Sequence, residues 1–380
     1  MNTKIYGTIG PACQDTDTLV RLFEEGMTGI RINLSHSNLR DAENWIKNIH
    51  EAYRKYGEQK KINASMPGAG ESESLNEMQE SETLNKMQES ELLNEMQELE
   101  ILMDLQGPEL RIGKLSASRM VKEGDGITLL PEGQNNLFDP TEIPVPELIM
   151  PYLTPGQEVL LDDGKILLQT EELFRTNTGY AAECKVVRGG EIKSKKSIAL
   201  PGAELYPPTL TKQDLENIHD AKKYGITGVM LPFVRNQQDL KNLRQALIDE
   251  KVENIQIFAK IENMDGVNQL PELLDDCDEI VIARGDLGNA MPLWELPVVQ
   301  AHIAKICREN GKPFMVVTQM LASMEQAAVP TRAEVSDIFR AVSEGAASVM
   351  LTGETAAGKH PVEAMKYMVN TVRNAKQWML

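Results

Sequence analysis

The sequence predicts an α/β fold, a (β/α)8 TIM barrel with a smaller β domain inserted into one of its loops. Three observations lead to this prediction. The chain has 380 residues, a length that suits one large α/β domain carrying a smaller one. Short apolar runs alternate with helical patterns at spacings of about 25 to 40 residues, as strand-then-helix units do. One unit is interrupted by about 100 residues rich in Gly and Pro breaks, which are typical of short antiparallel strands.

The eight predicted strands are mostly continuous apolar runs, as expected for strands that are buried on both faces. In chain order they are Lys4–Ile9, Gly29–Asn33, Ile101–Leu105, Gly228–Pro232, Gln256–Ile261, Glu279–Ala283, Phe314–Thr318 and Ser348–Leu351. The predicted helices are Asp15–Glu25, Leu39–Tyr56, Thr211–Tyr224, Asn236–Asp249, Gly266–Leu274, Leu296–Asn310, Thr331–Glu344 and Pro361–Lys376. Several begin with recognisable signals, such as Thr211 followed by Asp214, or Pro361 in a first turn.

The interruption falls between the third strand and the next barrel helix. We expect the barrel to comprise residues 1–113 and 199–380, and a small inserted β-barrel domain to comprise residues 114–198. A domain inserted after the carboxyl end of a strand enters on the face where barrel active sites lie. We therefore expect this domain to act as a lid.

A second insertion, at about residues 66–98, contains the nine-residue repeat ESESLNEMQ, ESETLNKMQ and ESELLNEMQ, beginning at Glu71. Residues 71–100 include ten Glu and one Lys, which supply half of the formal net charge of −18. At about 100° per residue, successive repeats face opposite sides, so no continuous apolar stripe forms. We expect a solvated acidic helix or a disordered segment that projects from the barrel face opposite the active site. A partner-binding helix is the alternative.

The composition argues against several classes of protein. Asp and Glu total 57 against 39 Lys and Arg, which disfavours nucleic acid or an anionic membrane as a partner. No uncharged apolar run is long enough to span a membrane, and the first residues lack the features of a secretory signal. The four cysteines are widely separated and form no CxxC pair. We therefore expect reduced thiols in a cytoplasmic protein.

Polar residues at the carboxyl ends of the predicted strands are the candidates for chemistry. Glu262 and Asp286 are 24 residues apart, one strand–helix unit, so both carboxylates reach the barrel mouth on neighbouring strands. Two carboxylates in a solvated mouth can hold Mg²⁺ or Mn²⁺, with substrate oxygens and water as further ligands. Lys260 points to the same side as Glu262, and Arg31 adds a second cation. Together they predict an anionic, phosphate-bearing substrate.

Nine segments resemble the pyruvate kinase family, in order and in register from Thr3 to the C-terminus, with only the acidic repeat outside the resemblance. They are TKIYGTIGPA, RINLSHS, DLQGPELRIG, LLDDGKI, AKIENMDGV, ARGDLG, VTQMLASM, PTRAEVSD and LTGETAAGKHP. The resemblance implies a glycolytic phosphotransferase that moves phosphate from phosphoenolpyruvate to ADP, giving pyruvate and ATP. It also implies dependence on Mg²⁺ (or Mn²⁺) and K⁺.

The resemblance gives a role to each matching residue. The implied catalytic residues are Lys260, which steadies the transferring phosphoryl group, Arg31 and Thr318. The implied substrate-binding residues are Lys260, Ala283, Arg284, Gly285, Asp286 and Thr318. The implied ligands of the divalent metal are Glu262 and Asp286. The enolate left behind is implied to take its proton through water near Thr318 and Thr352.

A monovalent-cation site and a nucleotide site are implied as well. The K⁺ ligands are oxygen donors: Asn33, Ser35, Asp104 and the Leu105 carbonyl. Glu109 is the residue type that the family associates with K⁺ dependence. The residues implied to lie toward the nucleotide are Arg31, His36 and Arg111, with Asp163 on the lid side.

The sequence also departs from the family pattern. DTKGPEIR reads DLQGPELR here, so Leu105 and Gln106 replace a Thr and a Lys, and Ala199 replaces the usual Asn before LPG. The sequence ends after the eighth barrel helix, where most of the family continues into an effector domain. We therefore expect no activation by sugar bisphosphate and a homo-oligomer smaller than the usual tetramer.

Other interpretations are open. The chain could be a paralogue that acts on pyruvate or oxaloacetate as a lyase or decarboxylase, with Gln106 as an adaptation. It could instead be a catalytically weak regulatory or scaffold protein that presents its acidic repeat to a partner. Among single residues, Glu262 and Asp286 could form salt bridges, His36 could cap the following helix, and Asp163 could serve a turn.

Overall fold

The structure is a computed structural model of the chain. It describes residues 3–35, 37–65, 99–108, 110–133, 139, 141–162, 164–176, 179–203 and 207–379. The acidic repeat lies outside the described residues, as do His36, Glu109 and Asp163. The chain forms two compact units, one made of Met1–Gln106 with Lys212–Leu380 and the other of Gly107–Thr211.

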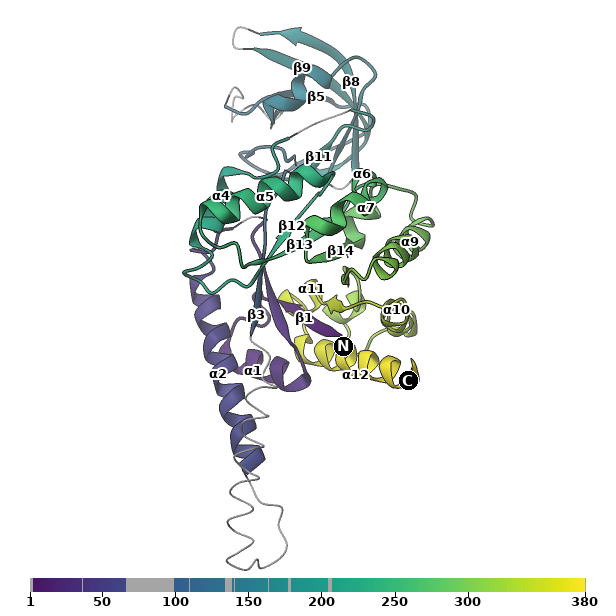
Figure 1. The fold of residues 1–380 in the computed structure, drawn as a ribbon. Helices are drawn as coiled ribbons and strands as arrows, with labels where there is room; N and C mark the ends of the chain where they lie inside the picture. The colour runs from purple at the N-terminus through teal and green to yellow at the C-terminus, as the bar shows by residue number, and fades with distance from the viewer. Residues whose placement is uncertain are drawn as a thin grey trace, which may run out of the picture. The chain divides into compact units, whose positions relative to one another are not determined.

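Eight parallel strands close into a barrel in the first unit (Figure 1). They are β1 (Lys4–Thr8), β2 (Gly29–Asn33), β3 (Glu100–Asp104), β12 (Gly228–Leu231), β13 (Gln256–Ile261), β14 (Glu279–Ala283), β15 (Phe314–Val317) and β16 (Ser348–Met350). Neighbours in the barrel follow chain order, with β3 beside β12 and β16 beside β1. The predicted (β/α)8 barrel is therefore confirmed, and each predicted strand end lies within one residue of the observed end.

Helices connect the strands and lie outside the barrel (Figure 1). They are α1 (Thr16–Glu25), α2 (Glu43–Ser65), α4 (Lys212–Asp220), α5 (Gln237–Asp249), α6 (Met264–Asn268), α7 (Leu270–Leu273), α8 (Arg284–Leu287), α9 (Leu296–Glu309), α10 (Arg332–Ser343), α11 (Gly353–Ala356) and α12 (Pro361–Met379). Short 3-10 turns are η1 (Glu147–Tyr152), η2 (Leu274–Asp276) and η3 (Ala322–Glu325). The single helix predicted over 266–274 is wrong: the chain forms α6 and α7 there, because Pro271 favours the first turn of a new helix and cannot continue an earlier one.

Alternate side chains of each strand point into the barrel, which is filled rather than hollow. The buried apolar residues of its middle are Tyr6, Leu102, Met230, Phe258, Val281, Ala283, Met315, Val317 and Met350. The same alternation turns polar side chains inward at both ends of the strands. Lys4 and Glu279 lie at the amino ends, and Asp104 and Lys260 lie at or next to the carboxyl ends, where Arg31 from the middle of β2 reaches Asp104. We call the first end the floor and the second the mouth.

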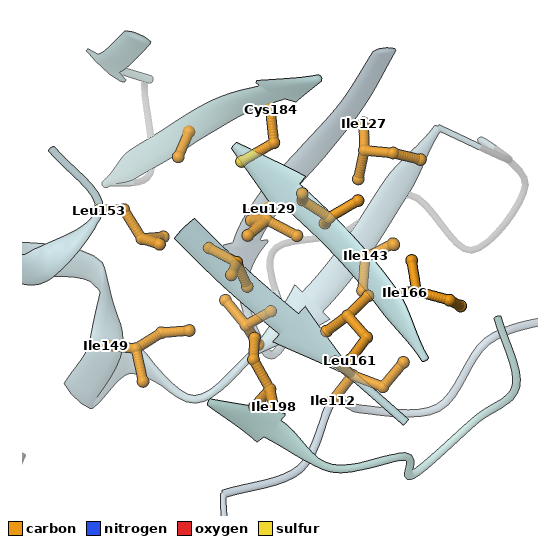
Figure 2. Packing of buried hydrophobic residues seen from close by; sticks show 14 of the residues in the cluster. Ile112, Ile127, Leu129, Ile143, Ile149, Leu153, Leu161, Ile166, Cys184 and Ile198 are labelled. Atoms are coloured by element: carbon orange, nitrogen blue, oxygen red, sulfur yellow. The ribbon is translucent and has the colours of Figure 1, made fainter. Parts of the chain in front are cut away.

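The second unit consists of β-strands and the turn η1 in the part of it that the structure describes. A six-stranded sheet has the order β11-β7-β8-β9-β5-β6, and β4 pairs with β10. The strands are β4 (Arg119–Val121), β5 (Gly126–Pro131), β6 (Glu142–Val145), β7 (Glu158–Leu161), β8 (Ile166–Arg175), β9 (Tyr180–Arg188), β10 (Gly190–Ile192) and β11 (Ile198–Ala199). The unit has its own hydrophobic core, in which Ile127, Leu129 and Leu161 take part (Figure 2).

The antiparallel arrangement predicted for this unit is wrong at one pair of strands. β5 runs parallel to β6, with Thr128 opposite Glu142 and Pro131 opposite Val145, whereas the other pairs in the sheet are antiparallel. The chain after β5 must therefore return to the start of that strand before it forms β6, which a tight hairpin cannot do. The predicted insertion, residues 114–198, lies within this unit, which begins earlier and ends later.

No helix in the described parts of the chain has both the length and the apolar character needed to cross a membrane. Cys13, Cys184, Cys277 and Cys307 are buried, free thiols. Burial raises the pKa of Cys13 and Cys184 to about 11 and that of Cys277 and Cys307 to about 12. All four are therefore protonated near neutral pH, which suits packing rather than nucleophilic chemistry.

Candidate active site

The mouth brings charged side chains from β2, β3 and β13 together around one carboxylate. Arg31 Nε and Nη2 lie 2.8 and 2.7 Å from Oδ2 of Asp104. Lys260 Nζ lies 3.1 Å from both carboxylate oxygens of the same residue. The side chains of Arg31 and Lys260 are each 13% exposed, and that of Asp104 only 2%. Asp104 therefore anchors both of the cations that the sequence places at this end of the barrel.

Glu262 is the second carboxylate beside Lys260. Lys260 Nζ lies 3.0 Å from Oε1 of Glu262, and the Phe233 N–H donates to Oε2 at 2.7 Å. Burial raises the pKa of Glu262 to about 7; Lys260 opposes this shift, while the negative charges of Asp286 and Asp104 add to it. Glu262 is thus a buried carboxyl whose ionised form gains from additional positive charge.

The protonation states of Lys260 and Asp104 support each other. Burial alone would raise the pKa of Asp104, but the charges of Lys260 and Arg31 hold it below its ordinary range. Burial alone would lower the pKa of Lys260, but Asp104 and Glu262 hold it above its ordinary range. Lys260 is therefore an ammonium ion fixed by two carboxylates, a positioned positive charge rather than a base.

Asp286 lies in α8, immediately beyond the carboxyl end of β14. Its charge is felt at Glu262, whose pKa it helps to raise. A divalent cation would offset the charge of Asp286 that opposes ionisation of Glu262, so these two carboxylates fit Mg²⁺ or Mn²⁺. Within the described ranges, no three His, Cys, Asp or Glu side chains gather as a metal cluster. Further ligands would have to come from backbone, substrate or water oxygens.

The residues predicted to hold a monovalent cation lie on two adjacent strand ends. Asn33 is opposite Asp104 in the register of β2 and β3, and Leu105 follows directly. The Leu34 N–H donates to the Asp104 carbonyl at 2.9 Å, and the Ser35 N–H donates to the Asn33 side-chain oxygen at 3.2 Å. These oxygen donors fit a hard cation such as K⁺. The carboxylate of Asp104, however, already binds Arg31 and Lys260, a role that sequence reasoning missed.

Arg284 joins the loops that follow β14 and β15. Its Nη2 and Nε donate to the Thr318 carbonyl at 2.7 and 3.2 Å, and its Nη1 lies 2.6 Å from Oδ2 of Asp337 in α10. The side chain of Arg284 is therefore occupied within the protein. If residues 283–285 contact substrate, they do so through backbone atoms, as the resemblance implies.

Glu354 joins the loops that follow β15 and β16. Its Oε1 accepts the Leu321 N–H at 2.9 Å, and its Oε2 accepts the N–H and hydroxyl of Thr352 at 2.7 and 3.2 Å. Glu354 is 1% exposed. No role is predicted for Glu354 from the sequence, although its position two residues after Thr352 at a strand end was the available signal. It orients Thr352 next to the loop that carries Thr318.

Two further predicted positions lie apart from this group. Arg111 belongs to the second unit, where its Nη1 donates to the Lys195 carbonyl at 2.9 Å, so it is not among the groups that the barrel itself brings together. Gln106, which replaces a family Lys, donates its backbone N–H to Asp214 at 2.8 Å.

Comparison with known proteins identifies relatives over almost the whole chain. A family model described as "Pyruvate kinase, barrel domain" matches residues 1–70 and 70–365. A pyruvate kinase of Corynebacterium glutamicum is 34% identical over 375 residues, which cover 98% of this chain and 70% of the relative. A pyruvate kinase of Geobacillus stearothermophilus is 34% identical over 367 residues, covering 96% of this chain and 55% of the relative. One of Thermococcus litoralis is 32% identical over 378 residues, covering 99% and 70%.

These matches agree with the closed parallel barrel and with the order of the motifs along the chain. The family model covers most of the sequence, and the Corynebacterium relative exceeds 30% identity over the greater part of both chains. The chain therefore belongs to the pyruvate kinase family of enzymes.

Proposed function

We propose that the protein transfers the phosphoryl group of phosphoenolpyruvate to ADP, giving pyruvate and ATP, in a reaction that depends on Mg²⁺ and K⁺. The observation that carries this proposal is the convergence of Lys260, Arg31, Asp104 and Glu262 at the mouth. Phosphoryl transfer asks little covalent chemistry of a protein and depends mainly on positive charge held in place around the moving oxygens. Membership of the pyruvate kinase family supports the same reaction.

Lys260 and Arg31 would bind the phosphoryl group during transfer. Both side chains are held before substrate arrives: Lys260 by Asp104 and Glu262, and Arg31 by Asp104 and by a 3.3 Å contact of Nη1 with the Thr8 hydroxyl. Cations fixed in a site of low exposure need no reorganisation when charge develops on the transferring group. This preorganisation favours the transition state over the bound substrate.

Glu262 and Asp286 would hold the divalent cation, and Asn33, Ser35, Asp104 and the Leu105 carbonyl would hold K⁺. The divalent cation, when bound, supplies positive charge that stabilises phosphoryl and enolate oxygens. The chain's own contribution is to keep Glu262 ionised and oriented, through Lys260 and the Phe233 N–H.

The remaining steps concern the enolate and the nucleotide. The backbone of 283–285, with Thr318, would bind the substrate carboxylate, and water near Thr318 and Thr352 would deliver the proton that converts enolate to pyruvate. Arg31, His36 and Arg111 would contact ADP, with the second unit acting as a lid. A homo-oligomer and a partner for the acidic repeat stay predictions.

A coupled assay tests the proposal: pyruvate formed from phosphoenolpyruvate and ADP is reduced by lactate dehydrogenase, and NADH loss is followed. We expect turnover that requires Mg²⁺, increases with K⁺ and does not change on addition of fructose bisphosphate. Equal rates with and without K⁺ would contradict the K⁺ site. Decarboxylation of oxaloacetate without any phosphotransfer to ADP would instead support the lyase alternative.

A further inference from the structure

Two consecutive residues at the mouth have an unusual backbone conformation. Thr318 and Gln319, directly after β15, have φ angles of +80° and +54°. This left-handed region favours glycine, and it is least suited to a β-branched residue such as Thr318. Such a conformation persists only where the surrounding structure imposes it, and it commonly occurs at functional sites.

Arg284, the first residue of α8, holds this conformation in place. Two of its nitrogens donate to the Thr318 carbonyl, at 2.7 and 3.2 Å, and its Nη2 also lies 3.0 Å from the sulfur of Met320. The guanidinium thus contacts the residues on either side of Gln319. A charge-assisted fork of this kind is stronger than a single neutral hydrogen bond, because two donors meet one oxygen in fixed geometry.

Gly285 of α8 also packs closely against Thr318. A Cβ atom added at Gly285 would lie 2.9 Å from Cγ2 of Thr318, closer than real contacts allow. The α8 backbone therefore touches the Thr318 side chain, and this side chain would have to move to admit a methyl group. Arg284 and Gly285, which are adjacent in sequence, constrain the carbonyl and the side chain of Thr318 respectively.

Arg284 is itself oriented by α10. Oδ2 of Asp337 lies 2.6 Å from its Nη1, and the side chains are 11% exposed for Arg284 and 30% for Asp337. The same helix is tied to the loop after β15 at a second point. Glu334, in the capping box with Thr331, accepts the N–H and hydroxyl of Ser323 at 2.7 and 2.6 Å. Helix α10 thus bonds to the loop after β15 through Glu334 and to the Arg284 guanidinium through Asp337.

We propose that Asp337 is a positioning residue for the reaction: through Arg284 it holds Thr318 in the conformation in which the enolate receives its proton. The inference rests on the proposed function and adds a residue that acts without touching substrate. It requires that Asp337 affect the chemistry only while Arg284 is present.

The test compares Asp337→Ala and Asp337→Asn with wild type. The Ala variant should lower kcat about 10-fold or more with little change in the KM for ADP, because Arg284 loses its orientation while the phosphate-binding cations remain. The exchange of pyruvate methyl hydrogens with D2O, followed by NMR, should slow by the same factor, since it needs enolate protonation but no ADP. The Asn variant keeps an acceptor oxygen for Nη1 and should recover part of the loss.

A double-mutant cycle with Arg284→Met separates positioning from a general loss of structure. The double variant should lose no more activity than the more impaired single variant, since both changes break one unit. The matched control is Asp220→Ala, which breaks the Arg40–Asp220 pair, also at 2.6 Å. This control should leave kcat and methyl exchange unchanged.

Three results would overturn the inference: wild-type turnover and exchange in folded Asp337→Ala, additive losses in the cycle, or an equal loss in Asp220→Ala. Amide hydrogen exchange of residues 318–325 gives a readout that does not depend on activity. It should quicken in Asp337→Ala but not in Asp220→Ala. Absence of phosphotransfer in the wild-type protein would overturn the proposed function. The amide hydrogen exchange comparison would still decide whether Asp337 holds the loop.

Discussion

The mouth and the floor of the barrel both contain buried charged groups, but they balance them differently. At the mouth, Arg31 and Lys260 share Asp104, and Lys260 also binds Glu262. At the floor, the Lys4 ammonium and the Tyr6 hydroxyl both donate to Glu100, and the Ser348 hydroxyl donates to Glu279. Burial raises the pKa of Glu279 to about 7, as it does for Glu262.

A raised carboxyl pKa therefore does not distinguish the two ends. What differs is the set of neighbours. Glu262 lies beside an ammonium that also binds Asp104, and the charge of Asp286 reaches it. Glu279 accepts the Ser348 hydroxyl; the charges of Lys4 and Glu100 reach it in opposite directions, but Lys4 itself pairs with Glu100. Two cations held by one carboxylate beside a second carboxylate, rather than a shifted pKa, indicate where an anionic ligand would bind.

Replacing the ammonium at each end should give the largest difference. Lys260→Met removes a fixed charge from the proposed path of the phosphoryl group and should lower kcat at least about 10³-fold. Lys4→Met removes the floor cation and should leave kcat near the wild-type value. Both variants are measured in the coupled assay. Equal losses in the two would contradict the assignment of the mouth as the active site.

Replacing a carboxyl at each end should separate metal binding from structure. Glu262→Gln and Asp286→Asn should each weaken Mn²⁺ binding about 10²-fold, whereas Glu279→Gln should leave it unchanged. The EPR signal of unbound Mn²⁺ during a titration measures these affinities. Tight Mn²⁺ binding that survives both mouth changes would place the metal elsewhere.

Glu279 at the floor should affect the pH dependence of the free energy of unfolding. Because folding raises the pKa of Glu279 from its usual 4.5 to about 7, the folded state holds a proton that the unfolded state loses first. The contribution of this bound proton to the free energy of unfolding is fully present below about pH 4.5 and is lost as the pH rises to about 7. Between pH 5 and pH 8, the free energy of unfolding of Glu279→Gln should therefore increase by on the order of 2 kcal/mol relative to that of wild type.

Urea unfolding at the two pH values measures this gain. The control is Glu272→Gln, a change of the same type at an exposed position in α7. Parallel pH dependence of Glu279→Gln and wild type would show that Glu279 ionises normally in the folded protein.

The smallest effect is expected for the acidic repeat. The segment precedes β3, whose first residue, Glu100, belongs to the floor. Deleting residues 71–97 should therefore leave kcat within about twofold of the wild-type value, since the chemistry is assigned to the other end. A large loss in the coupled assay would refute the predicted opposite-face placement of the repeat.

The barrel strands and the strand-end positions of Lys260 and Glu262 could be predicted from the sequence because their signals are local. Apolar runs of strand length marked β1 to β3 and β12 to β16, and a polar residue beyond an apolar run marked Lys260 and Glu262. The same alternation marks Glu100 and Asp104 at the two ends of β3, so the floor cluster was within reach of the sequence and was missed.

Other features depend on distant contacts and could not be read locally. That Asp104 binds two cations depends on the register of β2 with β3, on the position of β13 across β12, and on side-chain rotamers. The left-handed Thr318 contradicts its own backbone preference, which is why the strand was predicted to include it. Arg284 and Asp337, 53 residues apart, impose that conformation from outside.

Arg31 and Lys260 carry like charges and would repel each other if they stood alone in the mouth. The carboxylate of Asp104 binds both cations and so offsets the repulsion between them. The unfavourable approach of the two cations is therefore compensated during folding rather than during substrate binding. A phosphate that binds at the mouth, as proposed, would meet both cations already in place. The variant Asp104→Asn should consequently lose the contributions of both Arg31 and Lys260 to catalysis at once, because this one residue positions both cations.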